Sequence, residues 1–65
     1  MRISATRIEI IMAKRGMTKA ALADSCGIRQ QNISTIIRRG TCEPKTAYKL
    51  AVGLGVDVSD ILEGA

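Results

Sequence analysis

Residues 29–39 contain amide, hydroxyl and guanidinium side chains that could form hydrogen bonds with a ligand. A helix over residues 30–38 would gather on one face the hydrogen-bonding side chains Gln30, Gln31, Ser34 and Thr35, together with Arg38. The opposite face would carry Ile33, Ile36 and Ile37. Such a helix can anchor to a core on its apolar side and offer donors and acceptors to the edges of DNA bases on the other.

A polar outer face is also typical of any solvated amphipathic helix, so the glutamines alone do not decide between the two interpretations. The charges around them favour DNA. No acidic residue occurs between Asp24 and Glu43, whereas Arg29, Arg38 and Arg39 lie in that interval. Arg29 is also a poor helix cap and would place its charge at the positive end of the helix dipole, a penalty that a phosphate group would remove. An arginine that simply points into water remains an equal alternative.

The elements that must position these side chains are two short helices joined by a tight turn. Residues 18–39 contain a capping Thr18, an apolar Leu22, and Gly27, which can enter a left-handed backbone conformation without steric strain. This arrangement is typical of a helix-turn-helix.

Four helix starts along the chain are marked by hydrophobic staples, in which one apolar residue lies just before the cap and another lies four positions after it. The pairs are Ile3 with Ile8, Met17 with Leu22, Ile28 with Ile33, and Val56 with Ile61. We therefore predict helices over residues 5–15, 19–25 and 30–38, a fourth from Pro44 to a turn at residues 53–55, and a fifth over residues 58–62. Asp57 and Asp60 approximate a capping box for the last helix, and residues 63–65 are expected to form a frayed tail.

Length and composition limit the fold class. The chain has 65 residues and is expected to form a single domain over residues 1–65, burying only about 60% of the surface that its unfolded chain exposes. It has no Phe, no Trp and one Tyr, so its core must be built from aliphatic side chains, which favours an all-α bundle. The net charge of +4 favours a polyanionic partner.

Composition argues against several other classes. The two cysteines, Cys26 and Cys42, are too few ligands for a zinc site in a sequence without histidine, and we expect neither a metal nor a cofactor. Cys26 is interpreted as a buried apolar residue. The sequence has neither paired carboxylates on one helix face nor a phosphate-binding loop, so it does not indicate an enzyme. No apolar run approaches the ~20 residues of a membrane span, and without a signal peptide a soluble, cytoplasmic protein is expected.

The chain resembles the Cro/CI (XRE) family of helix-turn-helix domains over about residues 3–62. The residues that carry the resemblance are Gly16, Leu22, Ala23, Gly27, Ile28, Ile33, Ile36, Pro44, Leu50, Ala51, and Leu54 to Val56. The resemblance implies a compact bundle of five short helices, similar to the lambda repressor, with the helix-turn-helix formed by the second and third.

The resemblance also implies roles for individual residues. The base-reading positions would be Gln30, Gln31, Ser34 and Thr35. The phosphate-binding positions would be Thr18, Lys19, Arg29, Arg38, Arg39, Thr41 and Lys45, with the backbone at Gly40. The dimer interface would include Val56, Val58 and Ile61. Many relatives pair an arginine and a glutamate where this chain has Met12 and Ile37, and we predict that these two apolar side chains touch.

The function implied by the resemblance is a sequence-specific regulator that binds double-stranded DNA. It would act as a homodimer, most simply a repressor, on a near-palindromic operator with half-sites one turn, ~34 Å, apart. The alternative is that a domain of the same fold is an antitoxin-like or adaptor module that acts mainly through a protein partner.

Overall fold

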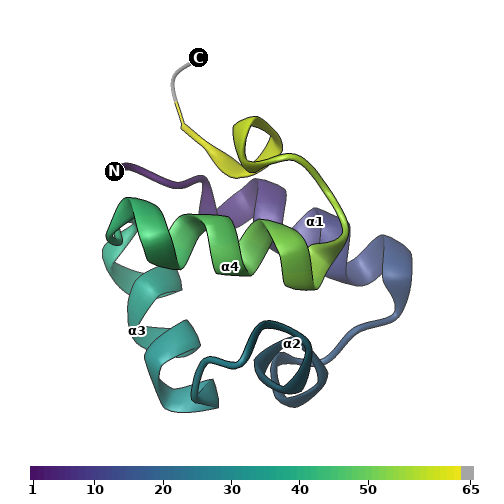
Figure 1. Ribbon diagram of the computed structural model, residues 1–65. Coiled ribbons are helices and arrows are strands. Elements are labelled where there is room, and N and C mark those ends of the chain that lie inside the picture. The colour runs from purple at the N-terminus through teal and green to yellow at the C-terminus, as the bar shows by residue number, and fades with distance from the viewer. Residues whose placement is uncertain (64–65) are drawn as a thin grey trace.

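A computed structural model describes residues 1–63, and within them the chain forms four α-helices followed by one short 3₁₀-helix (Figure 1). The helices are α1 (Ala5–Arg15), α2 (Lys19–Cys26), α3 (Gln30–Arg39), α4 (Pro44–Leu54) and η1 (Val58–Ile61). The predicted all-helical class is confirmed. The fifth helix differs from the prediction, because it is a single 3₁₀ turn that ends one residue early.

The helix starts follow the capping residues of the sequence. The side chains of Ser4 and Thr18 accept hydrogen bonds from the backbone N–H groups of Arg7 and Ala21. Asp57 and Asp60 form the predicted capping box of η1. These side chains satisfy N–H groups that a helix cannot satisfy itself, which fixes where each helix begins.

α4 ends within the turn that was predicted at residues 53–55, but Gly53 has a different role from the one expected. Gly53 does not break the helix but lies inside it, and α4 continues to Leu54 before Gly55 adopts a left-handed conformation with φ of 74°. Gly53 is required for a different reason. A Cβ atom at this position would lie 2.7 Å from the Cβ and 3.1 Å from the backbone nitrogen of Cys26, so glycine permits α2 and α4 to approach closely.

The hydrophobic core collects one or more side chains from every helix. The largest fully buried side chains are Ile3, Ile8, Leu22, Ile33, Leu50, Leu54 and Ile61. These include the second member of all four predicted staples, so each staple ties a helix start to the core. Met12 is buried and Ile37 is half-buried against the same core, so neither is exposed, although direct contact between them stays a prediction.

Both cysteines are free thiols. Cys26 is buried in the core, as predicted. Cys42 is half-buried in the segment before α4, and burial raises the pKa of its thiol above the ordinary value. The thiol of Cys42 is therefore protonated near neutral pH, which makes it a weak nucleophile and a weak metal ligand.

The two ends of the chain are joined by backbone hydrogen bonds. The N–H of Ser4 donates to the carbonyl of Ile61 at 2.7 Å, and the N–H of Glu63 donates to the carbonyl of Arg2 at 3.3 Å. Glu63, the first residue of the predicted tail, thus has a bonded backbone N–H, and Gly64 and Ala65 lie outside the described residues. No helix within residues 1–63 has the length and apolar character to cross a membrane.

Candidate nucleic-acid interface

The turn between α2 and α3 sets the direction of the predicted reading helix. Gly27 ends α2 with φ of 70°, and its N–H donates to the carbonyl of Ala23. Arg29 is extended and precedes α3 without a side-chain capping bond, as expected for a poor cap. In Figure 1, α2 and α3 meet at this turn, and α4, which packs mainly against α2, lies above them. The α2–α3 unit is therefore a helix-turn-helix supported by α4.

The two faces of α3 are separated as the periodicity predicted. Ile33 is fully buried, and Ile36 and Ile37 are half-buried against the core. Gln30 and Gln31 are exposed in the first turn of the helix. Because the apolar side is fixed in the core, the two glutamine amides are held outward on a rigid element, which is where a base-reading helix needs them.

Ser34 and Thr35 are less accessible than expected, since both are half-buried. The hydroxyl of Thr35 donates a hydrogen bond to the carbonyl of Gln31 at 3.0 Å. With its proton engaged inside the helix, Thr35 can still offer its methyl group to a thymine, but it is not a free hydrogen-bond donor.

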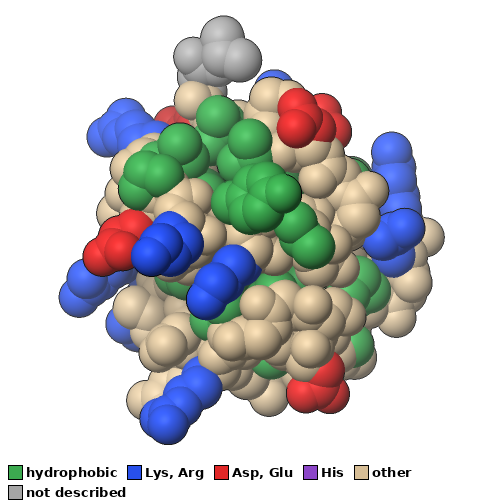
Figure 2. Space-filling view, viewed as in Figure 1, with side chains coloured by type: hydrophobic (Ala, Val, Ile, Leu, Met, Phe, Trp, Pro, Cys, Tyr) green, Lys and Arg blue, Asp and Glu red, His purple; other side chains and the backbone are tan. Residues whose placement is uncertain are grey.

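The cations predicted to bind phosphate are all exposed and follow the helix-turn-helix. Lys19 lies in the first turn of α2, and Arg29 lies in the turn that precedes α3. Arg38 and Arg39 lie in the last turn of α3, and Lys45 lies in the first turn of α4. Figure 2 shows lysine and arginine side chains gathered on the side of the molecule where α3 and the start of α4 lie. An excess of cations on one side of a domain is the electrostatic footprint of a nucleic-acid surface.

The two threonines predicted at phosphate positions differ in their availability. Thr18 uses its oxygen as an acceptor for Ala21 at 3.1 Å, so its hydroxyl proton can still point toward a ligand at the start of α2. Thr41 donates its hydroxyl to the carbonyl of Met1 at 3.0 Å. The hydroxyl proton of Thr41 is thus engaged by the N-terminal segment, although the residue itself is exposed.

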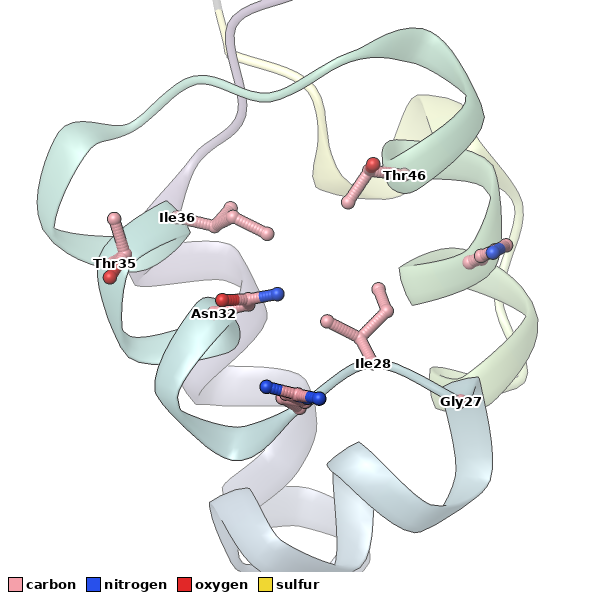
Figure 3. Close-up of a pocket in the computed structure, with 8 residues that line it drawn as sticks. Gly27, Ile28, Asn32, Thr35, Ile36 and Thr46 are labelled. Atoms are coloured by element: carbon pink, nitrogen blue, oxygen red, sulfur yellow. The ribbon is translucent and has the colours of Figure 1, made fainter.

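A groove of about 460 Å³ lies between α3 and α4 and is lined in part by the predicted site residues Arg29 and Thr35. Its lining also includes three polar residues that the sequence analysis did not select, Asn32, Thr46 and Lys49. Figure 3 shows the amide of Asn32 directed into the space between the two helices, with Thr46 on the other side. At 100° per residue Asn32 lies next to Thr35 on the helical wheel, and this position was the signal that could have found it.

The residues predicted for a dimer interface separate into two groups. Val56 and Val58 are half-buried and present part of their surface. Ile61 has 0% exposure because it is the staple residue of η1 and packs in the core of its own chain. Its assignment to a dimer surface is corrected, since a fully buried side chain cannot meet a partner without opening that core.

Comparison with known families matches residues 7–64 to the Cro/C1-type HTH DNA-binding domain, which is nearly the whole chain. A search of curated proteins gave no match, and a search of solved structures gave none. The match covers the entire α2–α3 unit, the exposed glutamines and the cations around them. This chain belongs to the Cro/C1-type helix-turn-helix family of DNA-binding domains.

Proposed function

We propose that this chain is a sequence-specific regulator that represses transcription by placing α3 in the major groove of operator DNA. The observation that carries the proposal is the division of α3, where Ile33 is fully buried while Gln30 and Gln31 are exposed. Glutamine can donate a hydrogen bond to N7 and accept one from the N6 amino group of the same adenine. Repression follows by steric exclusion of the polymerase and needs no chemistry and no cofactor, and we place the protein in the cytoplasm with its DNA.

Asn32 extends the proposed reading surface toward α4. Its amide has the same chemistry as that of glutamine and lies one position beyond Gln31. Ser34 and Thr35 complete the surface, with Thr35 contributing its methyl group rather than its hydroxyl.

Selection from a randomised duplex pool at near-physiological salt tests the proposal. We expect enrichment of an inverted repeat with half-sites one helical turn, ~34 Å, apart, and adenine within each half-site. Salt-sensitive binding without any enriched sequence would show that the domain does not read bases and would contradict the proposal.

The phosphate contacts predict a change in salt dependence. Replacing Arg38 by alanine removes one exposed cation at the end of α3 from each bound copy, so the slope of log Kd against log salt should decrease by about 0.9 per copy, for operator and unrelated DNA alike. Lys14→Ala is the matched control, because Lys14 is an exposed cation on α1 outside the proposed interface. Titrations at several salt concentrations measure both slopes, and equal slopes would exclude Arg38 from the phosphate contacts.

We further propose a homodimer, because one copy of α3 reads too few bases for useful specificity. Val58 is the best position at which to test it, since it is half-buried at the start of η1 beside Val56. Val58→Asp should convert cooperative binding to the inverted repeat into independent binding of half-sites. Sedimentation on operator DNA measures the stoichiometry, and circular dichroism verifies that the variant is folded. A folded variant that still binds as a dimer would move the interface elsewhere.

A further inference from the structure

A second groove lies between α1 and η1 and has no role in the proposed DNA contacts. Its volume is about 480 Å³. One wall is a continuous stripe along α1 formed by Arg7, Ile10, Ile11 and Lys14, which are spaced three and four residues apart and so share one helix face. The other wall is formed by Val56 and Asp60, and Arg15 closes one end.

The floor of this groove is apolar. Ile10 has 49% of its surface exposed, which is high for an isoleucine in a small domain. Ile11 and Val56 are half-buried beside it. Apolar side chains that are gathered in a concave surface, rather than scattered singly, mark a site that another apolar surface covers.

The rim of the groove carries three cations and one carboxylate. The guanidinium of Arg7 donates to the carbonyl of Leu62, and that of Arg15 donates to the carbonyl of Leu54, so both charges are held in fixed positions by backbone groups. The carboxylate of Asp60 accepts a hydrogen bond from the N–H of Asp57 in the capping box. The rim is therefore preorganised and positively charged around an apolar floor.

The groove is also separated from the DNA-reading helix. In Figure 1, η1 lies above α4 and the C-terminal half of α1 lies at the right, whereas α3 lies at the lower left, below α4. DNA has no apolar surface that could cover Ile10, and a second copy of this chain would bring the same excess of positive charge. The complementary ligand combines negative charge with apolar side chains.

We propose that the α1–η1 groove docks an acidic amphipathic helix from a partner protein. Apolar side chains of that helix, three and four residues apart, cover Ile10, Ile11 and Val56, and its carboxylates pair with Arg7 and Lys14. This proposal is independent of base reading by α3, and it assigns a place for a protein that binds while the domain is on DNA.

The test uses a fluorescent peptide of about 16 residues with leucines at helical spacing and glutamates elsewhere, and a counterpart with lysines in place of the glutamates. We expect the acidic peptide alone to bind, and Lys14→Glu to weaken it about tenfold or more. Lys49→Glu is the matched control, because it makes the same charge change on α4, outside this groove, and should change the affinity less than twofold. Backbone amide NMR shifts should localise binding to α1 and η1.

Three results would overturn the proposal. The first is no binding of the acidic peptide at millimolar concentration to a protein shown by NMR to be folded. The second is equal binding of the two peptides, or shifts confined to the exposed face of α4 around Tyr48 and Val52. The third is loss of self-association in Lys14→Glu by sedimentation, which would identify a second copy as the occupant.

Discussion

Replacing Gln30 and Gln31 together by alanine is expected to weaken binding to the selected operator by about 30-fold or more. Each bidentate contact to a base discriminates by about 1–3 kcal/mol, and 1.4 kcal/mol corresponds to a factor of ten in Kd. Both side chains are exposed, so the free energy of unfolding should change by less than about 0.5 kcal/mol. Competition titrations with operator and unrelated DNA measure the loss.

The pattern of the loss identifies its cause. Affinity for unrelated DNA and the salt slope should be unchanged, because the variant keeps every cation. Arg38→Ala gives the opposite pattern, a lower slope with unchanged base preference. If the double variant keeps the operator preference, then α3 does not read the sequence through its first turn, and the partner-dependent alternative gains support.

Replacing Gly53 by alanine is expected to destabilise the fold by about 1–3 kcal/mol, which corresponds to a decrease in Tm of roughly 4–8 °C per kcal/mol in a domain of this size. Helix propensity alone predicts the opposite sign, because alanine is favoured over glycine inside a helix by about 1 kcal/mol. The steric overlap with Cys26 is expected to outweigh the gain in helix propensity. The new Cβ would meet the Cβ, N and Cα atoms of Cys26 at 2.7 to 3.2 Å, and no side-chain rotation can move these atoms.

Val52→Ala is the control for this prediction. Val52 is the neighbour of Gly53 on α4, but 58% of its surface is exposed, so its unfolding free energy should change by less than about 0.5 kcal/mol. Denaturant unfolding followed by circular dichroism measures both variants. A stability of Gly53→Ala above that of the original chain would mean that α2 and α4 are further apart than the structure shows.

Local sequence determined where the helices begin. Ser4, Thr18 and Asp57 each satisfy backbone N–H groups within their own helix, so no distant contact is needed to place those starts. The same is true of the two faces of α3, because a period of 3.6 residues separates Ile33 from Gln30 and Gln31 wherever the helix packs. The exposure of the two glutamines and of the surrounding cations could therefore be predicted before the structure was known.

Tertiary structure decided the features that depend on residues far apart in the sequence. Gly53 was predicted to lie in the turn after α4, but it lies inside the helix, where its lack of a Cβ permits the close approach of Cys26 on α2. Ile61 looked available to a partner, but the staple that starts η1 also buries it. The hydroxyl of Thr41 is engaged by the carbonyl of Met1, which only the packed chain brings close to it. A local pattern fixes which residues share a helix face, whereas burial and close approach depend on which other helix packs against that face.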